Sequence, residues 1–330
     1  MSVLLKTGLA LLGTWSTLSF AGGDYADNPA TLALIDELVQ EQAFDRAQLM
    51  DVFADAERKE SIIKAMSRPA EKSKPWYDYR KIFITGKRER QGLDFYAQHR
   101  ETLQRAEREM GVPAELVVAI LGVETYYGRI TGSYRVIDAL STLAFDFPRR
   151  ATFFTKELKN YLILSREQEL DPLVMKGSYA GAMGYGQFMP SSYRAYAIDF
   201  DGDGKVDIWN NPVDAIGSVA NYFKHHGWQA GEPVVFPAQV TESVSEDVFN
   251  NSLKPGKTVR EFAEAGVSAV AEPTLPPDTM ATAMKFETEG GYEYWLGLHN
   301  FYVITRYNHS SMYAMCVYQL SQLLAAQVGE

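Results

Sequence analysis

The pattern of residues 113–169 most limits the possible folds, because it is almost continuously helical. Apolar residues recur there at helical spacing, and the only breaks fall near residues 128–132 and at Pro148. Further helical patterns cover residues 30–66, 86–109, 213–226 and 310–326. We therefore expect a mainly helical (α+β) chain, with short strands in a small subdomain over residues 231–305.

The first helix of this stretch carries an unusual carboxylate. Pro113 suits a first helical position, and Gly128 can supply a left-handed cap at the other end. Glu124 follows Ile120 by four residues, so it should share the face of the core-facing hydrophobes. Apolar surroundings disfavour a charged carboxyl, so its pKa should rise and suit it to general acid catalysis. The alternative is a helix-end glutamate that reaches water or pairs with Arg129.

Composition narrows the class of protein further. The chain has 330 residues, of which 46% are hydrophobic and 12% aromatic, which supports a sizeable core and argues against disorder. Its formal net charge of −10 speaks against a nucleic-acid backbone as the main partner. The single cysteine, Cys316, cannot form an intramolecular disulfide, and its apolar helical surroundings predict a buried, inert thiol.

The first 21 residues have the layout of a secretory signal peptide. Lys6 precedes an apolar stretch that runs to about Leu18, and Ser19, Phe20 and Ala21 precede the expected cleavage point. A membrane anchor is the competing interpretation, but the apolar stretch is short and interrupted by polar residues and glycines. We expect an exported protein with no transmembrane segment in the mature chain.

An acidic loop matches most of an EF-hand calcium loop. The expected ligands are the carboxylates of Asp199, Asp201, Asp203, Asp207 and Asp214 and the carbonyl oxygen of Lys205. Gly204 stands at the sixth position, whereas Asn210 replaces the glutamate of the twelfth position. Calcium, with sodium as the alternative, should play a structural role, because a single loop does not suit a sensor. A solvated acidic turn is the other interpretation, and no organic cofactor is expected.

Four long segments appear in one order. They are residues 122–129, 142–150, 177–192 and 210–223. Together they resemble the lytic murein transglycosylase B family, and the resemblance runs from about residue 28 to the C-terminus. It implies a lysozyme-like helical core and a peptidoglycan substrate, both glycan strands and stem peptides. The absence of a lipidated cysteine is similar to the soluble periplasmic members, which are expected to be monomers.

The resemblance also implies roles for individual residues. Glu124 matches the family's single catalytic acid and base, and the acidic loop matches its EF-hand-like metal site. Ser178 and Gln187 match polar residues that orient the N-acetyl group and the carboxyl. The residues matching the sugar-binding groove are Tyr79, Tyr222, Tyr307, Asn308 and Tyr313. Arg149 and Arg150 would meet stem-peptide carboxylates.

Each of these supporting residues has a structural alternative. The tyrosines could be core residues with satisfied hydroxyl groups, and the two arginines could be a solvated helix start. Ser178 and Gln187 could hydrogen-bond only to loop backbone. The units expected along the chain are 1–21 (signal peptide), 22–112 (helical region with an extended connection at 67–80), 113–230 (catalytic core with the loop 199–214), 231–305 (β-containing subdomain) and 306–330 (helix returning to the core).

The chemistry depends on how many carboxylates take part. Most glycosidases need two, but Asp138 and Asp146 have the pattern of helix-end residues, which leaves Glu124 alone. One glutamate suffices if the muramyl C6 hydroxyl replaces water, which predicts a lytic transglycosylase that forms a 1,6-anhydro product. A hydrolytic lysozyme-like muramidase and a non-catalytic cell-wall-binding protein are the alternatives.

Overall fold

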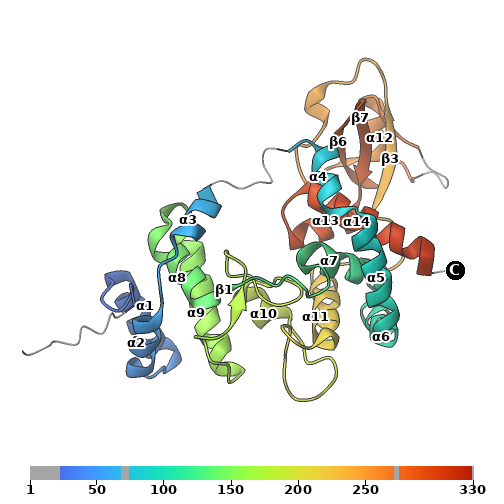
Figure 1. The fold of residues 1–330 in the computed structure, drawn as a ribbon. Coiled ribbons are helices and arrows are strands. Elements are labelled where there is room, and N and C mark those ends of the chain that lie inside the picture. Colours follow the sequence, from blue (N-terminus) through green and yellow to red (C-terminus); the bar gives the residue numbers. More distant parts are fainter. Residues whose placement is uncertain (1–22, 68–73, 271–274, 329–330) are drawn as a thin grey trace, which may run out of the picture.

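The computed structural model describes residues 23–67, 74–270 and 275–328 (Figure 1). The expected signal peptide, residues 1–21, lies outside the described residues. Among the described residues, no helix combines the length and the apolar character needed to cross a bilayer. The protein is mainly helical with a small five-stranded antiparallel sheet, as expected; a second, two-stranded sheet pairs β1 (Tyr134–Arg135) with β2 (Lys176–Gly177) outside the region where strands were expected.

One group of helices joins the N-terminal part of the chain to two later helices. It consists of α1 (Pro29–Gln42), α2 (Arg46–Asp55), α3 (Glu60–Ser67), α8 (Val136–Asp146) and α9 (Ala151–Glu167). In this group α1 contacts α9 and α3 contacts α8. Side-chain caps define where the early helices begin, since Asn28 accepts from the amide of Ala30 and Asp45 from that of Gln48.

A second group surrounds the helix that carries Glu124. It consists of α5 (Gly86–Gln98), α6 (Arg100–Met110), α7 (Ala114–Thr125), α11 (Pro212–His225) and α14 (Ser311–Val328). Helix α7 contacts all four of the others and is buried on nearly every side. The short helix α10 (Pro190–Tyr196) contacts both α9 and α11 and so links the two groups. One helix was expected over residues 86–109, but the backbone breaks at His99 between α5 and α6.

The prediction of an extended connection over residues 67–80 is wrong in its second half. Helix α4 runs from Trp76 to Phe83 and contacts both the sheet and α14. The Trp76 ring packs 4.9 Å from the ring of Phe286, and its indole nitrogen donates to Glu293 at 2.7 Å. These tertiary contacts, made more than 200 residues along the chain, override the local signal of the flanking prolines.

The small sheet has five strands in the order β4-β6-β7-β3-β5, and all paired neighbours are antiparallel. Its strands are β3 (Val235–Val240), β4 (Lys257–Thr258), β5 (Val267–Ala269), β6 (Met280–Thr288) and β7 (Gly291–Gly297). Helix α12 (Val259–Glu264) begins with a capping box between Thr258 and Glu261. Strands were expected within residues 231–305, but β7 stops at Gly297 and helix α13 (His299–Tyr307) follows.

Two hydrophobic cores hold these parts together. The main core spans both helical groups and takes in Met284 and Phe286 of the sheet. A smaller core lies within the sheet subdomain, where Phe249 and Phe262 pack on residues of β6 and β7. Cys316 belongs to the main core and is fully buried, and burial raises the pKa of its thiol to about 12. The predicted burial of Cys316 is therefore confirmed, and the raised pKa disfavours the thiolate that a nucleophile needs.

Candidate active site

Glu124 lies at the carboxyl end of α7, one residue before the helix ends. Its side chain is half-buried, whereas Val123 and Thr125 beside it are buried. The helix begins at Ala114 with Pro113 as the capping residue, one position later than expected. The left-handed cap also begins earlier than Gly128, because Tyr126 and Tyr127 already have φ values of 56° and 61°.

The Glu124 carboxylate is held by a tyrosine from a distant helix. The Tyr313 hydroxyl, in the first turn of α14, donates to Glu124 Oε1 at 2.5 Å. Burial raises the pKa of Tyr313 well above its ordinary value, and the nearby charge of Glu124 raises it further. The same two causes, in the same order, raise the pKa of Tyr307. Both phenols therefore remain protonated beside Glu124.

Two residues that the sequence did not single out fix the position of α7. The Thr125 hydroxyl donates to the Tyr185 carbonyl at 2.8 Å and accepts from the Gly128 amide at 2.9 Å. Arg88 is buried, and its guanidinium donates to the Gly122 carbonyl of α7 at 3.0 Å. Thr125 stands inside the motif that contains Glu124, so that signal was available. Arg88 had none, because it lies in a polar helical segment where arginine is usually exposed.

The glycine-rich loop, residues 177–190, carries two of the predicted polar residues. The Ser178 hydroxyl accepts from the amides of Ala180 and Ala182, at 3.3 and 3.1 Å. The Gln187 side-chain nitrogen donates to the carbonyls of Thr131 and Gly184, both at 3.0 Å. Both side chains thus bond to backbone, as the alternative interpretation expected. These bonds leave the Ser178 O–H as a donor and the Gln187 carbonyl oxygen as an acceptor without partners among the described residues.

Tyr307 approaches this loop so closely that residue 186 must be glycine. The Tyr307 hydroxyl donates to the Gly186 carbonyl at 2.5 Å. A Cβ added at Gly186 would lie 2.7 Å from that hydroxyl oxygen. On its other side the Tyr307 ring stacks on Phe223, with centroids 5.7 Å apart and planes 16° apart. The loop is therefore fitted against α13 by the backbone of Gly186 and against both α13 and α11 by the Phe188 ring, whose centroid lies 5.9 Å from that of Tyr307 and 5.8 Å from that of Tyr222.

The remaining predicted groove residues differ in exposure. Tyr79 and Tyr222 are buried, and the Tyr222 hydroxyl donates to the Arg306 carbonyl at 2.5 Å. Asn308 is half-buried and forms the C-terminal cap of α13. Burial of Tyr222 agrees with a packing role, and contact of these side chains with a sugar stays a prediction.

Arg149 and Arg150 lie away from the Glu124 contacts just described. Both are exposed in the short 3-10 helix η2 (Pro148–Arg150) that joins α8 to α9. The Arg150 guanidinium lies 4.2 Å from the ring centroid of Phe153, and neither arginine forms an ion pair with a described residue. Their charges are therefore free to meet an anion.

Asp138 and Asp146 are already committed to structural contacts. Asp138 is buried, accepts from the Glu57 amide at 2.9 Å and forms an ion pair with Arg135 at 2.8 Å. Asp146 accepts from the Tyr25 hydroxyl at 2.6 Å. Neither carboxylate is available as a partner for Glu124, and Glu124 is the acidic residue whose charge acts on both Tyr307 and Tyr313.

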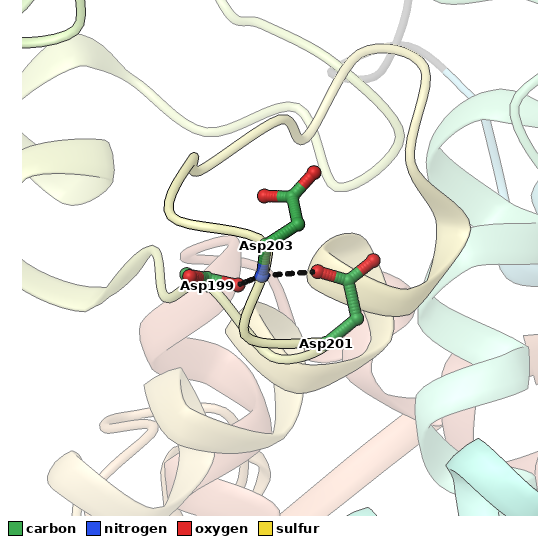
Figure 2. Close-up of side chains that lie close together, drawn as sticks. All are labelled: Asp199, Asp201 and Asp203. Carbon is green, nitrogen blue, oxygen red and sulfur yellow. Dashed lines mark hydrogen bonds between the residues drawn. The ribbon is translucent and has the colours of Figure 1, made fainter.

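The acidic loop between α10 and α11 gathers three carboxylates. One ligand oxygen each from Asp199, Asp201 and Asp203 lies within 4.8 Å of the others. Figure 2 shows the Asp203 amide between the Asp199 and Asp201 carboxylates, to each of which it donates at 3.2 Å. A hydrogen bond from the Gly204 amide is the main cause that lowers the pKa of Asp199. Several hard, ionised oxygens this close together fit calcium.

The other two predicted carboxylate ligands, Asp207 and Asp214, accept hydrogen bonds from backbone amides of the loop. Asp214 is fully buried and accepts from the amides of Phe200 and Asp207, at 2.7 and 2.8 Å. Asp207 accepts from the amides of Trp209 and Asn210, at 2.8 and 2.9 Å. The structure therefore brings three of the five carboxylates together and uses the other two to shape the loop. The loop carbonyl of Lys205 stays a predicted ligand.

Comparison with known proteins identifies the family. The family described as "Transglycosylase SLT domain" matches residues 27–322. The chain belongs to this family. It is 45% identical over 313 residues to membrane-bound lytic murein transglycosylase B of Escherichia coli (strain K12), which covers 92% of this chain and 85% of the relative.

Solved structures agree with this family assignment. Soluble lytic transglycosylase SltB1 from Pseudomonas aeruginosa is 54% identical, with a TM-score of 0.87 over 92% of this chain and 100% of that one. Lytic transglycosylase Slt35 from Escherichia coli, in complex with calcium, is 44% identical, with a TM-score of 0.86 over 94% of this chain and 96% of that one. The expected lysozyme-like fold and family are thereby confirmed, and the chain is an enzyme of the lytic transglycosylase family.

Proposed function

We propose that this enzyme cleaves the β-1,4 bond between N-acetylmuramic acid and N-acetylglucosamine in peptidoglycan, and that Glu124 is its single acid and base. Within this enzyme family, one observation supports the assignment of Glu124 as the acid and base. The Glu124 carboxyl lies at the half-buried end of α7 with the Tyr313 hydroxyl 2.5 Å from it, while Asp138 and Asp146 are occupied elsewhere.

The first step is the departure of the N-acetylglucosamine leaving group. Protonated Glu124 gives its proton to the bridging oxygen as the bond from that oxygen to the muramyl C1 breaks. The oxygen of the muramyl N-acetyl group bonds to C1 and offsets its developing charge. The Ser178 O–H can donate to that N-acetyl group, and the Gln187 carbonyl oxygen can accept from its N–H.

The second step closes the anhydro ring. The Glu124 carboxylate removes the proton from the muramyl C6 hydroxyl, and the C6 oxygen attacks C1 and displaces the N-acetyl oxygen. Glu124 is protonated again, and no water is consumed. Tyr313 donates to the carboxylate while it is charged, which stabilises the state between the two steps.

The sugar-binding groove is proposed to include the residues expected from the sequence, which are Tyr79, Tyr222, Tyr307, Asn308 and Tyr313. Arg149 and Arg150 are proposed to bind stem-peptide carboxylates.

We also propose that the enzyme acts in the periplasm as a monomer after removal of residues 1–21. The loop carboxylates of Asp199, Asp201 and Asp203 would hold calcium as a structural ion. Support comes from their spacing and from the calcium complex of Slt35.

The test combines a variant with product analysis. Glu124→Gln keeps the size of the side chain but cannot carry the proton, so turnover of purified sacculi should fall about 10²–10⁴-fold. The matched control is Glu115→Gln, at the other end of α7, which should remain active. Wild-type lysis by Glu124→Gln would refute the role of this glutamate.

Mass spectrometry of the products separates this reaction from the alternatives. Transglycosylation leaves anhydro ends that lack one water relative to reducing ends. Reducing ends as the main product would instead identify a hydrolytic muramidase. A non-catalytic binding protein would leave no cleared zone in a gel that contains sacculi.

A further inference from the structure

A pocket of about 520 Å³ lies between the sheet subdomain and helices α13 and α14. One wall is the loop of residues 250–254, and Met284 of β6 forms part of the floor. Tyr302, His309 and Ser311 line the opposite side. None of the roles assigned above uses this pocket.

The pocket is basic in an acidic protein. The chain has a net charge of −10, yet no aspartate or glutamate lines the pocket. Lys254 and His309 both line it. Arg306 does not line the pocket, but its guanidinium lies 5.9 Å from the ring centroid of Tyr302, which does. None of these three side chains forms an ion pair with a described acidic residue. An anion could therefore bind here without displacing an internal partner.

Other polar groups of the 250–254 loop are already used to hold its shape. Asn250 donates to the Lys285 carbonyl at 3.2 Å and accepts from the Lys285 amide at 3.3 Å. The Ser252 hydroxyl donates to the Lys254 carbonyl and accepts from its amide, both at 3.0 Å. Thr282 donates to the Ser252 carbonyl at 2.5 Å. The wall is thus formed before any ligand arrives, and the basic side chains remain available.

The pocket is close to the reacting carboxyl group. Ser311 is the first residue of α14, and Tyr313, two residues later, contacts Glu124. The side chains of Ser311 and Tyr313 leave different faces of the helix, but their backbones are only about 3 Å apart along its axis, and an extended stem peptide of several residues, at about 3.3 Å per residue, is long enough to pass around it. A group attached to a sugar ring at Glu124 can therefore reach the pocket.

We propose that this pocket binds a carboxylate of the stem peptide carried by a muramyl residue at or next to the reacting bond. The inference rests on the proposed function and adds a binding site to it. It is distinct from the contact expected at Arg149 and Arg150, which lie on η2 between α8 and α9. Because every muramyl residue can carry a peptide, one glycan strand can engage both places. Lys254 supplies the charge, and His309 can donate a hydrogen bond in either protonation state.

The test compares two forms of one substrate. Glycan strands with intact stem peptides and strands freed of peptides by an amidase are digested in parallel, and kcat/KM is measured for each. The double variant Lys254→Ala/His309→Ala should lower the ratio of the peptide-bearing value to the peptide-free value by roughly threefold to tenfold, as expected for exposed charge contacts. Lys257→Ala is the matched control, because this exposed lysine lies outside the pocket and should leave the ratio unchanged.

A binding measurement separates this inference from the reaction itself. Calorimetric titration of the Glu124→Gln variant with a muramyl disaccharide, with and without its peptide, needs no turnover. Peptide-dependent affinity that falls when Lys254 and His309 are replaced would support the pocket even if the proposed reaction failed. An unchanged ratio in the double variant, or an equal loss on both substrates, would overturn the inference while leaving the proposed reaction intact.

Discussion

Tyr313 reaches Glu124 from a helix that lies 189 residues later in the chain. A hydroxyl that donates to a carboxylate favours its ionised form, and burial keeps this phenol protonated by raising its pKa. An acid that must also serve as a base passes through a charged state in every cycle. The hydrogen bond from Tyr313 therefore stabilises the form of Glu124 that removes the C6 proton.

Tyr313→Phe should weaken catalysis without removing the acid. Loss of a hydrogen bond to a charged group costs about 1.5–3 kcal/mol, so kcat/KM should fall by roughly 10-fold to 100-fold. The alkaline limb of the pH profile of kcat/KM, where Glu124 loses the proton that it must donate, should also move to higher pH, because the carboxylate loses a partner that favoured its ionised form. Steady-state rates on solubilised glycan strands would measure both effects. A range from about pH 4 to about pH 8 begins near the ordinary pKa of a glutamate and extends to the raised values expected for Glu124.

The matched control is Tyr25→Phe, which removes the hydroxyl that donates to Asp146 in the other helical group. This change should lower the melting temperature but leave the pH profile in place. A Tyr313→Phe enzyme with the wild-type profile would show that the hydrogen bond has no catalytic role.

At the scale of elements, Arg88 connects three helices. Besides the Gly122 carbonyl of α7, its guanidinium donates to the carbonyls of Ile82 and Phe83 at the end of α4, at 2.7 and 2.8 Å. Its guanidinium carbon also lies 4.2 Å from the ring centroid of Tyr126. Burial lowers the pKa of Arg88. The three carbonyl oxygens and the Tyr126 ring stabilise the guanidinium charge in place of a carboxylate.

Arg88→Met should destabilise the protein and misplace α7. The Gly122 carbonyl keeps the Tyr126 amide as a donor, but the carbonyls of Ile82 and Phe83 lose the guanidinium. A buried unsatisfied group costs about 1–3 kcal/mol, so the free energy of unfolding should fall by at least about 2 kcal/mol. Chemical denaturation would measure this loss. Arg90→Met, at an exposed position of the same helix, is the control and should change stability by less than about 0.5 kcal/mol. Equal stability of the two variants would contradict the role of Arg88.

Local patterns predicted most helices, because their apolar spacing survives in the folded protein. The residues 113–169 gave α7, α8 and α9 with breaks at the expected places. Helix α4 was missed because its position depends on contacts with β6 and α14, which lie far beyond any local window. Helix α13 was missed because its aromatic-rich sequence has the composition of a strand. Glu124 could be singled out because a carboxylate on an apolar face breaks the local pattern. Arg88 and the pairing of Tyr313 with Glu124 could not, because they depend on packing between helices.

At the scale of the whole molecule, the packing does not follow chain order. Helices α1 to α3 pack with α8 and α9, whereas α5 and α6 pack with α7, α11 and α14 (Figure 1). The unit boundaries expected at residues 113, 231 and 306 stay a prediction, and contacts cross each of them. The acidic loop connects α10, which contacts α9, to α11, which contacts α6 and α7. It therefore lies where the two helical groups meet.

Calcium removal should for this reason lower the stability of the whole protein rather than of the loop alone. Binding to the folded state alone adds about 2.7 kcal/mol when the ion is present at 100 times its dissociation constant. For a chain of this length, that corresponds to a rise in melting temperature of roughly 4 °C. Calorimetric scans with calcium and with a chelator would measure the difference.

In Asp203→Asn the difference should shrink, because one of the three clustered carboxylates is gone. Magnesium at the same concentration should give a smaller rise than calcium, since it demands a tighter octahedral arrangement than an open acidic loop provides. Identical melting temperatures in calcium and in chelator would instead identify the loop as a solvated turn held by its own amide hydrogen bonds.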